Sequence, residues 1–292
     1  MERLPHVIGQ AKPTAPPRRQ KRNFGRYPLH TDPLSLIPNM TEAEEINSTG
    51  TSLVWKVPFG EKFIALKEIT KASLFTESLR ENATAEVAAL RALQHPHIVD
   101  FGGAFQTQDS LYVAMCYHKQ DLYKYTTSNL IVDARDAERW VKQLALALAY
   151  MKTKGFLHRD VKLENVLLTS RNTVCLADFG LSIMKADAVS TEMVGTRHCV
   201  APEVKARLPQ GYEIDAWGLG VLLFELLSGA VPPFTYKMIR SPHAPGHQPF
   251  EQSILRSSSA KCTRLMRGFL QCNPQNRLRV EELDKSQTCI VC

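Results

Sequence analysis

Long apolar runs are missing from this sequence. No stretch approaches the roughly 18 consecutive apolar residues of a membrane-spanning helix, so no membrane span is expected. The N-terminal residues also lack the apolar segment of a secretory signal, so no such signal is expected. The 7 cysteines are odd in number and lack the spacing of a disulfide framework, which predicts reduced thiols in an intracellular protein.

The remaining composition is that of a folded protein. Hydrophobic residues make up 44% of the chain and charged residues 22%, which is typical of a soluble globular protein. A chain of 292 residues exceeds the usual size of one hydrophobic core, so we expect two packed lobes and a tail.

The net charge of +7 is concentrated near the N-terminus. Residues 1–30 hold seven basic residues and one acidic residue, so the rest of the chain is almost neutral. The basic run at 18–22 fits a nuclear address, a patch for acidic partners, or a solvated disordered arm. Five prolines in the same 30 residues favour the arm, and we predict that residues 1–40 are disordered.

Hydrophobic periodicity predicts a small sheet with one helix, followed by a helical region. Strands are expected at 52–57, 63–69, 97–101 and 111–115, with a turn at 58–61. Helices are expected at 81–93, 134–152, 215–227 and 262–272. Residues 41–46 are acidic and have poor strand propensity. The segment 215–227 is apolar on nearly every side, which predicts a helix buried at the centre of its lobe.

One polar stretch organises the rest of the chain. It runs from His158 to Asn165 and leads into two short apolar segments, 166–168 and 174–177, which a tight turn separates. The resulting hairpin would bring Asp160, Asn165 and Asp178 to one edge. Carboxylate and amide oxygens are ligands that suit Mg²⁺.

This stretch resembles the catalytic and metal-binding loops of eukaryotic protein kinases. The motif His158-Arg159-Asp160 is followed by Asp178-Phe179-Gly180, 18 residues later, with Asn165 between them. The resemblance covers about residues 46–285 and implies an α+β, bilobal protein-kinase-like fold. Its boundaries would be a small β-rich N-lobe at 41–116, a larger helical C-lobe at 117–285 and a tail at 286–292.

The resemblance implies phosphoryl transfer from ATP with Mg²⁺ as cofactor. Asp160 would accept or orient the proton of the substrate hydroxyl, and Lys162 would stabilise the transferring phosphoryl group. Lys162 together with Thr196 resembles a Ser/Thr kinase rather than a tyrosine kinase. Asn165 and Asp178 would hold the metal ions.

The nucleotide would be held by further residues that match the family. Lys67 would pair the α- and β-phosphates, and Glu86, nineteen residues later, would fix that lysine. Strand residues of this kind belong to the core more often than to a binding site, so the remaining assignments rest on the resemblance alone. The expected adenine and ribose contacts are Val54, Ala65, Met115, Cys116, Tyr117, Asp121 and Leu167.

Two further motifs would be structural. Glu203, in Ala-Pro-Glu, would form a buried ion pair with Arg277. Asp215 would hold the backbone of His158 and Arg159 from the buried helix.

The phosphate loop departs from the family pattern. The three family glycine positions hold Asn47, Thr49 and Ser52, and only Gly50 lies nearby. Glycine lets backbone amides approach phosphate closely, so we predict weakened ATP binding rather than its loss.

The segment between Asp178 and Glu203 also differs. Glu192 stands where many kinases carry a phosphorylated threonine that docks on the arginine equivalent to Arg159. Either Glu192 partly replaces that phosphate, or it is an exposed acid in a mobile loop. Cys199 and Leu163 replace residues that face the substrate, so the peptide preference is open.

The last four residues, from Cys289 to Cys292, fit a prenylation signal. Either Cys289 is prenylated, which would place the protein at a membrane, or this is a plain disordered end.

We therefore predict a protein Ser/Thr kinase that acts as a monomer on protein substrates in the cytoplasm or nucleus, with no nucleic acid bound to its catalytic domain. The alternatives are a pseudokinase that binds partners through its folded lobes and a kinase that acts on a small molecule. The glycine-poor loop is the one feature that favours the pseudokinase.

Overall fold

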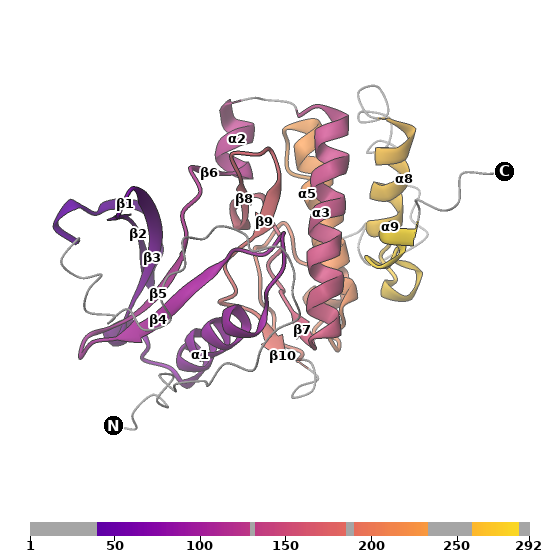
Figure 1. Cartoon of the computed structure of the whole chain (residues 1–292). Helices are drawn as coiled ribbons and strands as arrows, with labels where there is room; N and C mark the ends of the chain where they lie inside the picture. The colour runs from indigo at the N-terminus through magenta and orange to yellow at the C-terminus, as the bar shows by residue number, and fades with distance from the viewer. Residues whose placement is uncertain (1–39, 129–131, 185–189, 233–258, 286–292) are drawn as a thin grey trace. The chain divides into compact units, whose positions relative to one another are not determined.

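The structure is a computed structural model that describes residues 40–128, 132–184, 190–232 and 259–285 (Figure 1). Its described residues form two compact units. The first contains residues up to Arg91 together with Asp100–Tyr117, and the second contains Ala92–Val99 and residues from His118 onward. The predicted N-terminal arm, apart from Met40, and the tail with Cys289 lie outside the described residues. No described helix is both long and apolar enough to cross a membrane.

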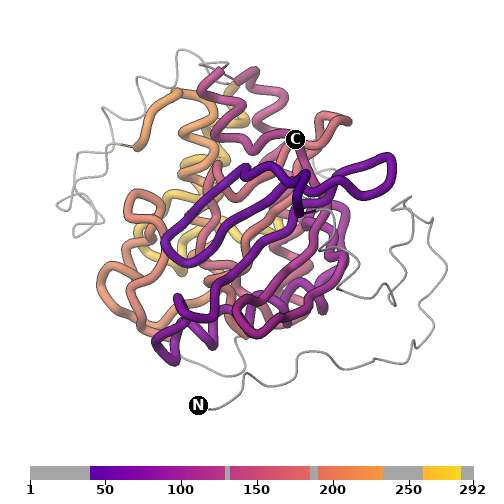
Figure 2. Tube along the Cα trace, turned by 90° about the vertical axis from the view of Figure 1, so that its left-hand side faces the viewer, coloured from indigo at the N-terminus to yellow at the C-terminus, as the bar shows by residue number. Residues whose placement is uncertain are grey.

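The first unit is a five-stranded antiparallel sheet with one helix. The strand order is β1-β2-β3-β5-β4, and Figure 2 shows these strands side by side as indigo and purple tubes. A core cluster of apolar side chains includes Val57 on β2, Leu66 on β3 and Phe105 on β4. The elements are β1 (Glu44–Ser48), β2 (Ser52–Phe59), β3 (Lys62–Thr70), α1 (Glu77–Ala92), β4 (Phe101–Gln106) and β5 (Ser110–Cys116).

Several predicted boundaries in this unit were wrong. Strand β2 continues through Pro58, because the chain reverses only at Gly60, whose φ of +59° suits glycine. The strand expected at 97–101 begins instead at Phe101. Ile98 belongs to the second unit, where it makes a single parallel bridge with Leu176 of β9 (Val174–Leu176). The apolar residues before Phe101 therefore do not mark a strand of the first unit's sheet.

The acidic segment that looked unsuited to a strand forms β1. It lies at the sheet edge and pairs only with β2, and four of its five residues are exposed. Lys56 on β2 forms an ion pair with Glu44 at 2.9 Å. An edge strand with a charged outer surface is compatible with low intrinsic strand propensity.

The second unit is mainly helical, as the sequence predicted. Helix α3 (Ala134–Thr153) begins at Asp133, whose side chain accepts a hydrogen bond from the Arg135 amide. Helix α5 (Glu213–Ser228) is buried from Ile214 to Leu227, which confirms the predicted central helix. The other helices are α2 (Leu122–Ser128), α4 (Pro202–Lys205), α8 (Ala260–Phe269) and the short terminal α9 (Glu282–Lys285).

The predicted hairpin is present in the second unit. Strands β8 (Val166–Leu168) and β9 (Val174–Leu176) are antiparallel, and β6 (Gln120–Asp121) pairs with the outer side of β8. The strands β7 (Phe156–Leu157) and β10 (Ile183–Met184) form a separate pair. The stretch His158–Asn165 therefore lies between β7 and β8, in a loop that two small sheets hold at both ends.

Helix α5 supports this loop by close packing. A Cβ atom added at Gly218 would lie 2.8 Å from Cβ of Val161, so any larger residue there would displace the loop. The glycine at position 218 of α5 thus lets the loop pack closely on the helix, and the rest of α5 forms the centre of the core.

Candidate active site

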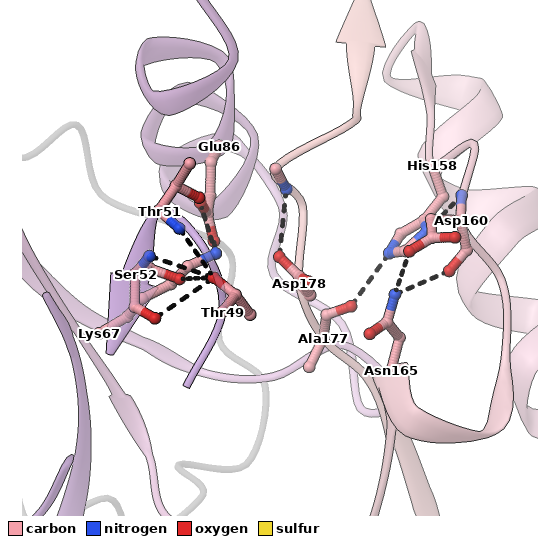
Figure 3. A network of polar contacts seen from close by, with 11 residues as sticks. Thr49, Thr51, Ser52, Lys67, Glu86, His158, Asp160, Asn165, Ala177 and Asp178 are labelled. Carbon is pink, nitrogen blue, oxygen red and sulfur yellow. Dashed lines mark hydrogen bonds and ion pairs between the residues drawn. The ribbon is translucent and has the colours of Figure 1, made fainter. Parts of the chain in front are cut away.

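A buried ion pair in the first unit joins β3 to α1. The Lys67 Nζ atom donates to both carboxylate oxygens of Glu86, at 2.7 and 2.9 Å (Figure 3). Glu86 is only 2% exposed, so its charge requires a partner of this kind. The predicted contact is therefore present, and it fixes the lysine ammonium at the surface of the sheet.

The strand register places further predicted residues beside Lys67. Val54 lies opposite Lys67, and Ala65 lies opposite Met115. Opposite residues share a face of an antiparallel sheet, as do residues two apart along a strand. Val54, Ala65, Lys67 and Met115 therefore share one face of the sheet.

Two further residues expected to contact the nucleotide, Cys116 and Tyr117, have partners of their own. The amide of Cys116 donates to the carbonyl oxygen of Asp100 at 3.0 Å, so that amide is already engaged. The Tyr117 ring lies edge-on to Phe63, with 6.0 Å between the ring centroids. Burial raises the pKa of the Cys116 thiol to about 11, so that thiol is a neutral group at neutral pH.

The turn between β1 and β2 is closed by side chains rather than by glycine. The Thr49 hydroxyl accepts from the amides of Thr51 and Ser52, at 3.4 and 3.1 Å, and lies 2.9 Å from the Ser52 hydroxyl (Figure 3). The Thr49 amide donates to the Ser52 carbonyl at 2.8 Å, and the Ser48 amide donates to the Asn47 side chain at 3.0 Å. Four backbone amides of this turn thus have internal acceptors.

In the second unit, Asp215 on α5 holds the backbone that precedes Asp160. Its carboxylate accepts from the amides of His158 and Arg159, at 2.9 and 2.8 Å, as predicted. Arg159 has a φ of +69°, an uncommon conformation for a residue with a side chain. Burial raises the pKa of Asp215 despite these donors and the nearby positive charges.

Asp160 is the centre of a hydrogen-bond network. One carboxylate oxygen accepts from the Thr196 amide at 3.0 Å and from its hydroxyl at 2.9 Å. The other oxygen accepts from the Asn165 side-chain nitrogen at 2.9 Å and lies 2.7 Å from Lys162 Nζ. Lys162 also donates to the Thr196 hydroxyl at 2.7 Å. Burial disfavours the Lys162 ammonium, but Asp160 outweighs that effect and raises the pKa of Lys162.

The residues expected to hold metal ions retain suitable oxygen atoms. Asn165 uses its amide nitrogen toward Asp160, so its carbonyl oxygen can face a cation (Figure 3). Asp178 is exposed and has a φ of +58°, and one carboxylate oxygen accepts from the Gly180 amide at 3.4 Å. A carboxylate and an amide oxygen are the hard ligands that Mg²⁺ prefers, so these residues fit that ion.

The neighbouring His158 and Phe179 have a packing role. The His158 ring nitrogen lies 3.1 Å from the Ala177 carbonyl oxygen, and its ring contacts Phe179 edge-on at 5.0 Å. Both side chains are fully buried. They connect the loop that carries Asp160 with the segment that carries Asp178.

The remaining predicted residues of the second unit are Asp121 and Leu167. Asp121 accepts from the amide of Lys124 at 2.7 Å, so it caps the first turn of α2. Leu167 lies on β8, partly buried and opposite Asp121 in the register. Each is therefore placed by the small sheet of β6, β8 and β9.

The predicted ion pair between Glu203 and Arg277 anchors helix α4. Two guanidinium nitrogens of Arg277 donate to the two Glu203 oxygens at 2.6 and 3.0 Å. Arg277 is 3% exposed and also donates to the backbone carbonyls of Glu213 and Gln271. Its charge is thus fully paired in the core.

Sequence reasoning missed two networks. The contacts that join Thr196 to Asp160 and Lys162 link residues more than thirty positions apart, and no local pattern signals them. The closure of the β1–β2 turn could have been found, because Thr49 and Ser52 have the spacing of a hydroxyl-capped turn.

Comparisons with known proteins identify the family of this chain. A family model described as the protein kinase domain matches residues 49–288. NUAK family SNF1-like kinase 1 from Homo sapiens is 31% identical over 232 residues, which cover 77% of this chain and 34% of that protein. CBL-interacting serine/threonine-protein kinase 13 from Arabidopsis thaliana is 31% identical over 229 residues, which cover 76% of this chain and 45% of that protein.

An Aurora kinase from Debaryomyces hansenii is likewise 31% identical over 230 residues, which cover 75% of this chain and 54% of that protein. The chain thus spans between about a third and a half of the length of these relatives. Protein kinase domains in general use ATP and Mg²⁺ and act on protein substrates. With a family match over most of its length and the α+β fold described above, this chain belongs to the protein kinase family.

Proposed function

We propose that this chain is a protein Ser/Thr kinase that transfers the γ-phosphoryl group of ATP to serine and threonine hydroxyls of protein substrates. The observation that carries the proposal is the network around Asp160, in which Lys162, Asn165 and Thr196 all contact its carboxylate. The relatives that match the chain are named as kinases, and one of them as a serine/threonine-protein kinase.

Asp160 is the proposed catalytic base. Its carboxylate is 7% exposed and is oriented by four donor contacts, so it can align an acceptor hydroxyl and take its proton with little reorganisation. Lys162 keeps its positive charge, because its pKa is raised, and it would stabilise charge that develops on the transferring group.

The nucleotide-holding residues are proposed in the same way. Lys67, held by Glu86, would bind phosphate oxygens, and Asn165 and Asp178 would hold Mg²⁺, which supplies charge neutralisation when bound. The positions of these side chains within each unit are compatible with those roles. The proposed adenine and ribose contacts are Val54, Ala65, Met115, Cys116 and Tyr117 from the first unit, and Asp121 and Leu167 from the second.

A phosphotransfer assay tests the proposal. The full chain would be incubated with radiolabelled ATP, Mg²⁺ and degenerate peptides whose only acceptor is serine, threonine or tyrosine. We expect label on the serine and threonine peptides, and none with the Asp160→Ala variant. A rise in melting temperature with Mg-ATP, but no transfer by wild type, would leave the pseudokinase reading; no shift and no transfer would contradict both nucleotide binding and catalysis.

A further inference from the structure

A turn in the second unit brings two consecutive metal-binding residue types onto the central helix. The turn runs from Thr196 to Cys199 and is closed by the Cys199 amide, which donates to the Thr196 carbonyl at 2.8 Å. His198 Nε2 lies 3.3 Å from a carboxylate oxygen of Glu225 on α5. One ligand atom each of His198, Cys199 and Glu225 lies within 4.8 Å of the other two.

Two of these three side chains, Glu225 and Cys199, are buried. Acidic groups near the Cys199 thiol are Glu225, Asp160 and Glu164, and basic groups near it are Lys162 and Lys205. A buried carboxylate beside a buried thiol supplies two ligand types that a cation such as Zn²⁺ binds. The His198 side chain is 33% exposed, which leaves a path from solvent.

We propose that His198, Cys199 and Glu225 form a Zn²⁺ site. In tetrahedral coordination, bond lengths of 2.0–2.3 Å place ligand atoms roughly 3.4 Å apart, close to the His198–Glu225 separation. Nitrogen and sulfur ligands favour Zn²⁺ over Mg²⁺ or Ca²⁺, which require oxygen. As the zinc–sulfur bond forms, the Cys199 thiol releases its proton to solvent. Three protein ligands leave one position for water.

Zinc at this position would fasten the Thr196–Cys199 turn to α5. Thr196 begins that turn and also contacts Asp160, so the metal would fix the segment that supports the proposed catalytic base. The site does not depend on the proposed kinase activity, since it is defined by its own ligand atoms.

Metal content gives the first test. The full chain, kept reduced, would be dialysed against buffered Zn²⁺, and its zinc content measured per chain for wild type, Cys199→Ser and Glu225→Gln. We expect both variants to hold one equivalent less than wild type. Cys272→Ser, which removes a partly buried thiol outside the cluster, is the matched control and should keep the wild-type content. Equal zinc content in wild type and Cys199→Ser would overturn the proposal.

Cobalt substitution gives a second, spectroscopic test. Co²⁺ bound through a thiolate shows a near-ultraviolet charge-transfer band, which we expect in wild type and not in Cys199→Ser. His198→Ala serves if the cysteine variant fails to fold, because His198 is partly exposed. It should weaken Co²⁺ and Zn²⁺ binding at least tenfold, because even the loss of a hydrogen-bond partner of a metal ligand typically costs about 10–100-fold.

Stability supplies an independent readout. Zinc at about a hundredfold above its Kd should raise the wild-type melting temperature by roughly 5–10 °C, and that of Cys199→Ser by much less. If Zn²⁺ shifts wild type and all variants equally and no cobalt–thiolate band appears, His198 and Glu225 form only an ion pair and the zinc site is wrong.

Discussion

The β1–β2 turn of the first unit and the His158–Asn165 loop of the second differ in which of their atoms would act. In the loop, the proposed work is done by side chains, and Asp160, Lys162 and Asn165 are present, although Leu163 departs from the family pattern. In the turn, the proposed work belongs to backbone amides, and the residues at the glycine positions are Asn47, Thr49 and Ser52. A catalytic carboxylate or amine has to be supplied by a specific residue type, whereas a turn can be closed by side-chain hydrogen bonds in place of glycine.

The chemistry that closes the turn has a cost for phosphate binding. Glycine has no side-chain acceptor, but here side chains accept from the amides of Ser48, Thr51 and Ser52, and the Ser52 carbonyl accepts from that of Thr49. An incoming phosphate must break these bonds before it can be bound by the same amides. The expected weakening of ATP binding therefore has a mechanism beyond steric crowding by side chains.

The largest expected effect comes from a substitution in the His158–Asn165 loop. Asp160→Asn keeps the size of the residue but removes the proton acceptor, so kcat should fall by about 10²–10⁴-fold. The free energy of unfolding should fall by about 1–3 kcal/mol, because the new amide nitrogen faces hydrogen-bond donors, while the Mg-ATP-induced rise in melting temperature should persist. Steady-state phosphorylation of a peptide measures the first quantity and thermal melting the second; a variant with more than a tenth of wild-type kcat would show that Asp160 is not the base.

The second prediction concerns the buried ion pair between Glu203 and Arg277. Arg277→Ala leaves Glu203 buried without its partner and should lower the free energy of unfolding by about 3–5 kcal/mol. Arg279→Ala, two residues along and exposed, is the control and should stay within about 0.5 kcal/mol. Urea denaturation measures both. Similar values for the two variants would mean that the pair contributes nothing specific to stability.

The third prediction concerns the β1–β2 turn and tests whether its internal hydrogen bonds weaken ATP binding. Thr49→Gly removes the acceptor that holds the amides of Thr51 and Ser52, so the Kd of Mg-ATP should fall about three- to tenfold, the value of one or two new hydrogen bonds to phosphate. Calorimetry or nucleotide displacement measures it. Thr51→Ala, in the same turn, should leave Kd unchanged. A wild-type Kd near that of a glycine-complete kinase would refute the expectation.

The smallest effect concerns Glu192. Its carboxylate lies 3.8 Å from Arg159 and is 64% exposed, while Arg159 already donates to the Leu181 carbonyl at 2.5 Å. An ion pair at this distance with one exposed partner contributes at most about 1 kcal/mol, so unphosphorylated Glu192→Ala should lose less than about fivefold in activity. Equal rates for wild type and variant would remove the idea that Glu192 imitates a phosphate, and a much larger loss would show that the ion pair tightens during catalysis.

Much of this molecule could be predicted, because kinase motifs fix pairs of residues across long separations. The contacts of Lys67 with Glu86, of Glu203 with Arg277, and of Asp215 with the loop backbone all follow from motif order and are present. Periodicity alone identified α3 and α5, whose apolar patterns are long and clear.

What could not be predicted depends on contacts that leave no local trace. The strand that begins at Phe101 was placed four residues early, because Ile98 and its neighbours are apolar for a bridge to Leu176. The convergence of His198 and Cys199 on Glu225 depends on the packing of a turn against a helix, and neither residue type nor spacing signals it. Short apolar runs and turn-to-helix contacts thus marked the limit of inference from sequence.

Asp215 holds the His158–Asn165 loop by accepting hydrogen bonds from two main-chain amides. This bears on which substitutions the loop can tolerate. Every amino acid except proline supplies such an amide, so these two hydrogen bonds do not themselves require particular side chains at positions 158 and 159. Other contacts restrict these positions: His158 is buried against Phe179, and Arg159 has a φ of +69°, which disfavours β-branched residues. In a saturation library, proline should remove a hydrogen bond to Asp215 at either position, whereas the other losses should follow from side-chain packing at 158 and from backbone conformation at 159.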